Sequence, residues 1–374
     1  MTVLDHARFG TRVAREVIDV RNTLEDLPPG WWAVVVTFEG RTTAIRYATL
    51  TPAADLTVGE WCGLAGRWRS SMTRADYIAG VEQIRARIAA GTIYQVNLCR
   101  ILSQPLEHWP DLAALAAVLD RGNPAPYAGL IDAPSAGVGV VCASPELYLS
   151  IDGTRIRSGP IKGTAPTPEA LLPKDVAENV MIVDLVRNDL SRICAPGTVE
   201  VEALCALEHH PGLVHLTSYI GGQVRAGTTW PRILDATFPP GSVSGAPKST
   251  ALATIGAVET SARDAYCGAI GWIDTRDPWH PRAELAVGIR TFFVRPAESG
   301  PELCFGTGAG ITWDSDPAQE WAETELKAAR LIDLATGSSR TRDEMETRAA
   351  TPALGSAGDD DREHRIWKGR AHGQ

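Results

Sequence analysis

The stretch that decides the fold runs from residue 136 to residue 164 and reads AGVGVVCASPELYLSIDGTRIRSGPIKGT. Its apolar residues predict a strand, a break at Ser144–Glu146, and a second strand. The pair Asp152-Gly153, which follows that strand, is typical of a two-residue hairpin turn. A proline-and-glycine turn then holds Lys162 between an apolar strand and a charged helix. The stretch therefore predicts antiparallel strands joined by short turns, and not a doubly wound parallel sheet.

The segments on either side alternate between strand and helix periodicity. Strand patterns occupy 31–40, 93–102, 212–224, 266–273, 283–294 and 302–311, and helix patterns occupy 73–90, 111–118, 173–197 and 316–337. The segment 230–259 predicts two helices around a Gly/Ser/Pro loop. In the helix 173–197 we expect Val176, Val180 and Val183 on the apolar side. Strands interleaved with helices in this way predict one α+β domain.

The periodicity also divides the chain. Residues 1–70 are expected to form an abbreviated N-terminal part of the same domain, and residues 71–336 its core. Residues 337–374 are rich in charged and small residues, which predicts a disordered tail.

Composition limits the classes of function. The 374 residues carry a net charge of −9, which argues against a nucleic-acid partner or an anionic membrane surface. Seven scattered cysteines without a CxxC pair predict buried free thiols in a reducing compartment. The first residues lack a signal-peptide pattern, and no apolar run is long enough to span a membrane. We therefore expect a cytoplasmic protein.

Two pairs of carboxylates are candidates for a metal site. Asp175 and Glu178 lie three residues apart in one predicted helix, and Glu320 and Glu323 lie three apart in another. This spacing places each pair on one helical face. Two such faces brought together would form an oxygen-rich site suited to Mg²⁺, although solvated acidic helix faces explain the same pattern.

Other segments allow a structural and a functional interpretation alike. The loop 241–249, GSVSGAPKS, could bind an anion through backbone N–H groups, but Pro247 interrupts the Gly-Lys-Ser order that a Walker A loop needs. Arg290 ends an apolar strand and would seek a carboxylate partner. His215 in a strand and Glu146 after a proline are each as typical of a core or turn residue as of a catalytic one.

Taken together and in this order, the segments resemble the chorismate-utilising enzyme family. The resemblance covers about residues 70–335, and the family's fold implies two antiparallel-rich β-sheets packed face to face with helices on the outside. The segments that carry it are YQVNL (94–98), SPEL (144–147), PIKGT (160–164), ENVMIVDLVRNDL (178–190), VHLTS (214–218), GSVSGAPK (241–248), YCGAIGW (266–272), IRT (289–291), GAGI (308–311) and DSDPAQEWAETELKA (314–328).

The resemblance implies a magnesium site and a substrate. Glu178 and Glu323 match the Mg²⁺ ligands, with Asp175 and Glu320 placed to hold the ion through water. Asp175 is shorter than the Glu that relatives often carry there. The Mg²⁺ would bind the ring carboxylate of chorismate, a dianion that an acidic protein could not otherwise accept beside four carboxylates.

The resemblance also implies the groups that bind the rest of chorismate. Arg290 and the backbone of Gly308, Ala309 and Gly310 match the clamp on the enolpyruvyl carboxylate, and Lys327 would neutralise carboxylate charge near the metal. The other implied substrate contacts are Gln95, Thr164, Ser242 and Gly245.

Two positions favour one branch of the family. Members that add water to chorismate carry a Lys general base where this chain has Gln95, and a neutral amide cannot deprotonate water. The anthranilate-forming branch usually has Ala where this chain has Lys162. In the branch that aminates C4, the matching amine attacks C2 and expels the C4 hydroxyl, and ammonia then displaces the lysine. Glu146 would be the general acid on the hydroxyl, with assistance from His215.

We therefore expect conversion of chorismate and ammonia to 4-amino-4-deoxychorismate on the route to p-aminobenzoate and folate. No glutaminase is recognised in the sequence, so a separate glutamine amidotransferase subunit is expected as the partner in a heterodimer. Three alternatives stay open: formation of anthranilate, a silent chorismate-binding homologue, and Lys162 acting only as a cation that pairs with a substrate carboxylate.

Overall fold

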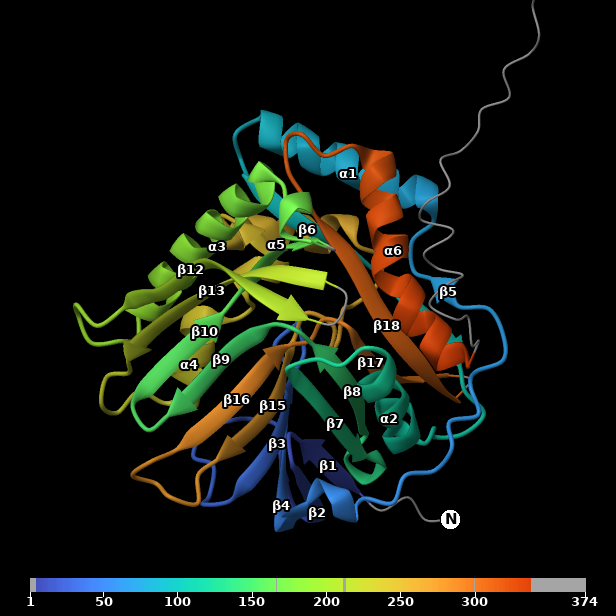
Figure 1. Ribbon diagram of the computed structural model, residues 1–374, viewed down its shortest axis with the longest axis vertical. Coiled ribbons are helices and arrows are strands. Elements are labelled where there is room, and N and C mark those ends of the chain that lie inside the picture. The colour runs from blue at the N-terminus through green and yellow to red at the C-terminus, as the bar shows by residue number, and fades with distance from the viewer. Residues whose placement is uncertain (1–4, 166, 211–212, 299, 338–374) are drawn as a thin grey trace, which may run out of the picture. The chain divides into compact units, whose positions relative to one another are not determined.

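The computed structural model describes residues 5–165, 167–210, 213–298 and 300–337 (Figure 1). The helices are α1 (Arg74–Ala89), α2 (Leu112–Gly122), α3 (Pro173–Ser191), α4 (Trp230–Thr237), α5 (Lys248–Val258) and α6 (Pro317–Thr336). The strands are β1 (His6–Phe9), β2 (Arg12–Arg21), β3 (Trp31–Val36), β4 (Thr42–Pro52), β5 (Arg69–Ser70), β6 (Gln95–Pro105), β7 (Tyr127–Ala133), β8 (Val138–Ser144), β9 (Leu147–Asp152), β10 (Arg155–Gly159), β11 (Ile161–Ala165), β12 (Glu200–His210), β13 (Leu213–Gln223), β14 (Gly245–Ala246), β15 (Ala269–Asp274), β16 (Arg282–Val287), β17 (Thr291–Ala297) and β18 (Gly300–Ile311).

The sheet has two halves. Within the described residues, antiparallel ladders join eighteen strands into one sheet. One half runs β2-β4-β3-β15-β16-β9-β10-β13, with β11 and β12 on β13, and the other half runs β7-β8-β17-β18-β6. Strand β1 pairs with both β2 and β7 and so connects the halves. The α+β class is confirmed, and the two expected sheets are continuous with each other through β1.

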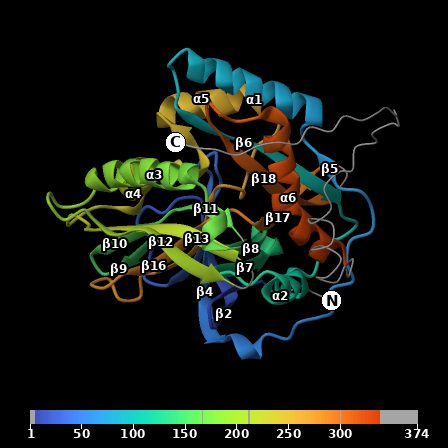
Figure 2. The ribbon, with the colours of Figure 1, turned by 45° about the horizontal axis from the view of Figure 1, so that its top comes forward.

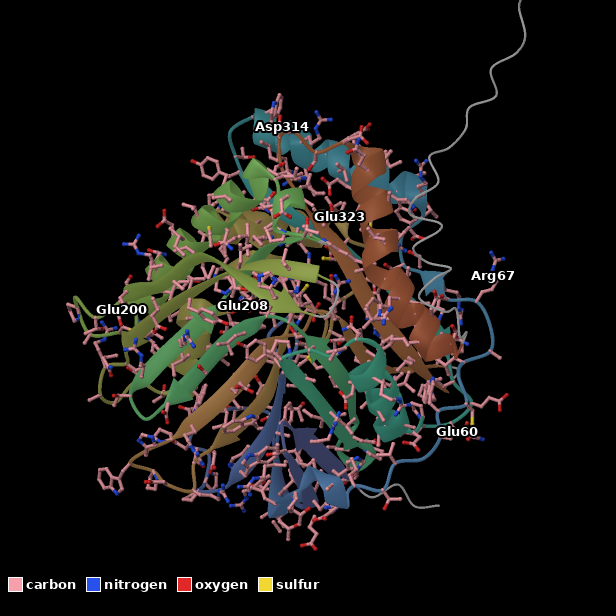
Figure 3. The ribbon with its side chains drawn as sticks, in the orientation of Figure 1. Glu60, Arg67, Glu200, Glu208, Asp314 and Glu323 are labelled. Carbon is pink, nitrogen blue, oxygen red and sulfur yellow. The ribbon has the colours of Figure 1, made fainter. Side chains whose placement is uncertain are left out.

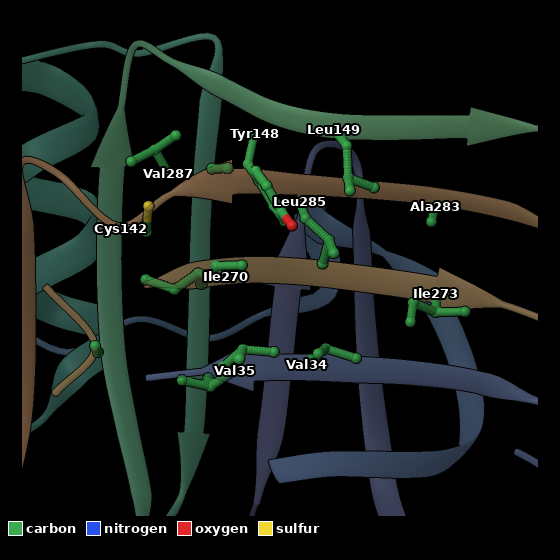
Figure 4. Packing of buried hydrophobic residues seen from close by; sticks show 14 of the residues in the cluster. Val34, Val35, Cys142, Tyr148, Leu149, Ile270, Ile273, Ala283, Leu285 and Val287 are labelled. Atoms are coloured by element: carbon green, nitrogen blue, oxygen red, sulfur yellow. The ribbon is translucent and has the colours of Figure 1, made fainter. Parts of the chain in front are cut away.

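The core lies between the two halves. Residues of β3, β9 and β15, such as Val34, Leu149 and Ile270, share one buried cluster with Cys142 of β8 and Cys304 of β18 (Figure 4). This is the face-to-face arrangement that the family resemblance implies.

In the half of the sheet that runs β7-β8-β17-β18-β6, every second side chain points away from the core between the halves. Val141 and Leu303 pack with Leu115 of α2 and Leu331 of α6 in a separate cluster. This period of two is what a sheet covered on both faces requires. Figure 2 shows α6 along β18 and α3 over the strands of the other half, so helices cover the outer faces.

The predicted hairpin is found, but its two-residue loop is Gly153-Thr154 and not Asp152-Gly153, because Asp152 of β9 pairs with Arg155 of β10. Strands β1 to β4 belong to the same sheet as the core, and β3 pairs with β15. The predicted tail, residues 337–374, lies outside the described residues apart from Gly337, which ends α6. None of the described helices is long and apolar enough to cross a membrane.

The predicted apolar side of the helix 173–197 is wrong in its first half. Val176 and Val180 are 44% and 41% exposed, whereas Asn179 and Val183 are buried. The reason is a polar contact: the Asn179 amide donates to the Leu216 carbonyl of β13 at 2.9 Å. This bond fixes which face of α3 meets the sheet.

The predicted strand 283–294 is two strands. Strand β16 pairs with β9 and β15 in one half of the sheet, and β17 pairs with β8 and β18 in the other. The three residues between them carry the chain across, and Arg290 adopts a left-handed φ of 53°. The cysteines also depart in part from expectation, because Cys62 is exposed and Cys205 half-buried while the other five are buried.

Candidate active site

Lys162 lies on a distorted strand. The register of β11 against β13 shifts between Ile161 and Thr164, which places a bulge at Lys162 and Gly163. Gly163 has a φ of 84°, and a Cβ there would lie 2.8 Å from the Asp175 Cβ of α3. Only glycine fits this close approach. The turn therefore holds Lys162, half-buried, beside the first turns of α3.

Charges from three parts of the chain converge on Lys162. Burial lowers the pKa of the Lys162 amine, while Glu178 of α3 and Glu146 act to raise it. Lys327 of α6 adds to the lowering, and Glu323 opposes it. The net direction is downward, which favours the uncharged amine that a nucleophile needs.

Glu146 sits in the bend between β8 and β9 and is only 3% exposed. Its carbonyl accepts from the Val287 N–H at 3.0 Å, which anchors the bend to β16. Burial raises the pKa of Glu146 to about 7, against opposing effects of Ser242 and Lys162. A carboxyl with this pKa keeps its proton close to neutrality and can donate it.

The GAGI segment forms an edge suited to an anion. Ladder β17–β18 ends at Phe305, whereas β6–β18 continues to Ile311. From Gly306 onward one side of β18 therefore has no strand partner among the described residues, and alternate backbone groups on that side face α6. The Gly308 carbonyl there accepts from Lys327 Nζ at 3.1 Å. A Cβ at Gly308 would lie 2.5 Å from the Cys99 sulfur, so the strands need glycine to approach.

Arg290 reaches α6 from the crossing between β16 and β17. Its guanidinium donates to the Lys327 carbonyl, and Lys327 Nζ pairs with Glu323 Oε1 at 2.6 Å. Among the described residues, Arg290 forms no ion pair with the side-chain carboxylate that the sequence led us to expect. A backbone carbonyl leaves the positive charge uncompensated, and the fork remains available to a substrate carboxylate.

Three buried polar groups near the site have no hydrogen-bond partner among the described residues. These are both polar atoms of the Gln95 amide and the hydroxyls of Ser242 and Thr217. Gln95 is 1% exposed, and a Cβ at Gly310 would lie 2.5 Å from its Nε2. Ser242 Oγ is near enough to Glu146 to lower its pKa without a well-aligned bond. Unpaired buried groups are costly, so a bound ligand is a natural partner for them.

The proposed metal ligands come from α3 and α6. Glu178 and Glu323 both act on the charge of Lys162 and so face the same region, and Figure 3 shows Glu323 on α6. Burial acts to raise the pKa of Glu323, but Lys327 and two further lysines hold it below its usual value. Among the described residues no group of three or more His, Cys, Asp or Glu is close enough to hold a metal. Two carboxylates suit Mg²⁺, which keeps several waters and takes further ligands from its substrate.

The outer two carboxylates are engaged elsewhere. Asp175 Oδ2 accepts from the Leu172 N–H at 2.8 Å and so caps the start of α3. Glu320 Oε1 accepts from Ser315 Oγ at 2.6 Å. Each bond leaves the second carboxylate oxygen for a water, and their roles around a metal stay predictions.

The remaining predicted residues lie on the strands around Lys162. His215 is buried in β13, with its Cα opposite Thr164 of β11, of which only the backbone is described. Gly245 has a φ of 145° and pairs with Val96, and a Cβ there would collide with the Gln95 carbonyl.

The sequence analysis missed two residues that the fold brings to this region. Thr217 lies opposite Ile161 across the bulge, and Lys174 acts on the charges of Glu320 and Glu323 across the gap from α3 to α6. Lys174 directly precedes Asp175, and Thr217 lies within VHLTS. Their position beside or within these motifs is therefore the feature of the sequence that could have identified them.

Cations, a buried acid and unpaired amide and hydroxyl groups converge where two sheet halves meet α3 and α6. Such a fold and site are suited to binding a small anionic molecule. The chain belongs to the chorismate binding enzyme family, whose pattern it matches over residues 52–333.

Curated relatives divide between two activities. An anthranilate synthase component 1 from Streptomyces coelicolor is 35% identical over 76% of this chain, and one from Haloarcula marismortui is 38% identical over 71%. The chain spans about half the length of each, 54% in both cases. An aminodeoxychorismate synthase component 1 from Klebsiella aerogenes is 33% identical over 87% of this chain and 74% of its own length.

Solved structures show the same fold. The menaquinone-specific isochorismate synthase of Escherichia coli superposes with a TM-score of 0.74 over 88% of each chain, at 19% identity. Anthranilate synthase component I from Streptococcus pneumoniae superposes with a TM-score of 0.69 over 89% of this chain and 93% of its own, at 22% identity.

Proposed function

We propose that this chain aminates chorismate at C4, giving 4-amino-4-deoxychorismate, with Lys162 as a covalent nucleophile. The observation that carries the proposal is the pairing of Lys162, whose pKa is lowered, with the nearby Glu146, whose pKa is raised to about 7. The first group favours a free amine near neutral pH and the second a retained proton. This is the combination that nucleophilic attack with acid-assisted departure of a hydroxyl requires.

The reaction is then two displacements. The Lys162 amine bonds to C2 of chorismate, both conjugated ring double bonds shift toward C4, and the C4 hydroxyl leaves as water with the Glu146 proton. Ammonia next bonds to C4, both double bonds shift back, and the Lys162 amine departs. Splitting one difficult substitution into two easier ones is the advantage of a covalent route.

The remaining groups would position the substrate. Arg290 and the free edge of β18 near Gly308 suit the enolpyruvyl carboxylate, and the Gln95 amide and Thr217 hydroxyl supply unpaired polar atoms. Glu178 and Glu323 would hold Mg²⁺, which when bound supplies a positive charge for the ring carboxylate. His215 stays a candidate for assistance at the C4 end of the ring.

The ammonia would come from a separate glutamine amidotransferase subunit. Support for a partner comes from the relatives, each of which is named component 1 of its enzyme. The product would serve p-aminobenzoate and folate synthesis.

Formation of anthranilate is the second candidate. It is favoured by the anthranilate synthase relatives, which are slightly more identical to this chain than the Klebsiella aerogenes relative is. Lys162 speaks against it, because amination at C2 followed by loss of pyruvate has no need of a lysine nucleophile at C2.

Product analysis separates the two candidates. The purified chain is incubated with chorismate, Mg²⁺ and an ammonium salt, and the products are resolved by chromatography while pyruvate is assayed separately. We expect 4-amino-4-deoxychorismate without pyruvate. Anthranilate with an equal amount of pyruvate would overturn the proposal, and no turnover with tight chorismate binding would favour a silent homologue.

A further inference from the structure

A small cavity adjoins Glu146, and Pro160, which precedes the strand of Lys162, is part of its lining. It is lined by Glu146, Tyr148, Asp189, Thr237 and Ser242, with apolar residues between them. It offers about 20 Å³ of room, enough for one ordered water. Glu146 and Asp189 are the two carboxyl groups of this lining, and Asp189 belongs to α3 beyond the residues assigned to substrate and metal.

We propose that Asp189, held by Lys248, returns a proton to Glu146 through a water in this cavity. Asp189 would act through Glu146 and touch no substrate. The inference rests on the proposed function in one respect, the role of Glu146 as the acid that releases the C4 hydroxyl.

The reaction creates the need for such a path. Chorismate, ammonia and one proton give the ammonium form of the aminated product and one water. The proton leaves Glu146 with the hydroxyl, so the Glu146 carboxylate must regain one proton in every cycle. A substrate in contact with the Glu146 carboxyl would exclude solvent from it, and the cavity offers another route for the proton.

A series of polar groups lines the cavity. Ser242 belongs to it with an unpaired Oγ, and a water there would give this hydroxyl the partner that it otherwise lacks. Asp189 belongs to the same lining, and its Oδ2 accepts from Lys248 Nζ at 2.7 Å. Lys248 Nζ also donates to the Thr237 carbonyl at 3.3 Å, which fixes its direction.

The Lys248 end of the series is the part most open to solvent. The side chains of Lys248 and Asp189 are 23% and 11% exposed, and as whole residues Asp189 is 8% and Glu146 3% exposed. Asp189 would take a proton from solvent at this edge and pass it to the cavity water, which passes one of its own protons to Glu146. Asp189 is left as a carboxylate that Lys248 stabilises, and the charges balance.

The charged groups around the series fit this direction of transfer. Burial raises the pKa of Asp189, while Lys248 and Arg192 oppose the rise. Lys162 is the charged group that faces Glu146 from β11. Both carboxyls therefore hold a proton more readily than solvated carboxyls do.

The test is Asp189→Asn in the full chain, with chorismate consumption followed at saturating ammonium and Mg²⁺. We expect kcat to fall about tenfold or more, within the range of lost proton transfer, with KM for chorismate unchanged within about twofold. The solvent deuterium isotope effect on kcat should increase, because reprotonation becomes limiting. Unchanged kcat, or a change in KM alone, would overturn the relay.

Two further variants keep the test decisive. Asp184→Asn removes the same charge from the same helix at a side chain that is 69% exposed, and kcat should not change. Val186→Ile adds a methyl group at the cavity wall without altering charge, and it should lower kcat with the same isotope signature by displacing the water. If Asp189→Asn fails to fold, Val186→Ile carries the test, and normal turnover in it would refute the relay.

The outcome is separable from that of the proposed function. Chorismate consumption is measured whatever the product, and anthranilate formation also removes the C4 hydroxyl. A wild-type enzyme that makes anthranilate would refute amination at C4 while leaving the Asp189 test intact.

Discussion

The ladder between β6 and β18 and the ladders around β13 follow opposite rules. Strand β6 pairs with β18 from Glu302 to Ile311 without a register shift. Its Cys99 and Ile101 belong to one apolar cluster, and its Leu98 and Leu102 belong to two others. Strand β13 meets β11 and β12 through shifted registers, and Cys205 of β12 has a φ of 50°. The half of the sheet with β6 and β18, here called the regular half, supports the fold. The half with β11, β12 and β13, here called the irregular half, holds Lys162. Departures from local rules concentrate where chemistry is expected.

Lys162→Ala changes a residue of the irregular half and should have the largest effect of all on turnover. We expect turnover to drop at least about a thousandfold, or about 4 kcal/mol of transition-state stabilisation. Chorismate binding, measured by calorimetry, should change little. Lys162→Arg is the matched variant, because it keeps the charge and removes the nucleophile. Recovery of turnover in Lys162→Arg would favour a cation that only pairs with a substrate carboxylate.

Leu115→Ala should produce the opposite pattern in the regular half. Leu115 of α2 is fully buried against β7 and β8, so its truncation should cost about 2–5 kcal/mol of unfolding free energy in urea titrations. The turnover number per folded molecule should stay within about twofold of wild type. A loss of turnover without a loss of stability would show that the two halves are not separable.

Glu146→Gln should stabilise the free protein as pH rises. The folded pKa of about 7 lies above the ordinary 4.5, so the wild type loses stability as pH rises through this interval, whereas the amide does not titrate. The advantage of the variant should grow by up to about 3 kcal/mol between pH 5 and pH 8. Urea unfolding at both pH values measures it, and an equal difference at each would contradict the raised pKa.

The same group sets the expected pH profile of the reaction. Protonated Glu146 is needed, so kcat/KM should fall as pH rises above about 7. Protonation of Lys162 should limit the reaction only at a lower pH than an ordinary lysine would allow, because the pKa of its amine is lowered by burial.

Thr217→Val should have the smallest effect on stability. The Thr217 hydroxyl is buried without a partner among the described residues, so the change should be neutral or stabilising by about 1 kcal/mol. The matched Thr254→Val, in α5, removes bonds to Thr250 and Arg87 and should destabilise by about 1 kcal/mol. Turnover should fall only in Thr217→Val. Equal destabilisation of both would argue that Thr217 is not reserved for a ligand.

The sequence predicted the regular elements well because apolar period governs them. The hairpin near Asp152-Gly153, the helix carrying Tyr77 and Val81, and the strand 302–311 follow from pattern alone and are found. The α+β class is confirmed for the same reason.

The features of the structure that the sequence did not predict depend on contacts between residues far apart in the chain. The face of α3 is set by the bond from Asn179 to Leu216, which leaves Val176 and Val180 outside. The break at Arg290 follows from strand pairing on both sides of the core. The apolar periodicity of a single segment predicts neither the buried face of α3 nor the break at Arg290. The candidate residues could be named from motifs, but the unpaired state of Gln95, Ser242 and Thr217 emerged only from the fold.

The central claim is that the Lys162 amine forms a bond to the chorismate ring, and mass spectrometry tests it most directly. The purified chain is incubated with chorismate and Mg²⁺ in the absence of ammonia, quenched in acid and digested. We predict a mass increase of chorismate less one water on the peptide that contains Lys162, lost on addition of ammonium before the quench. An unmodified Lys162 peptide throughout, from enzyme that turns over normally with ammonium, would contradict the account.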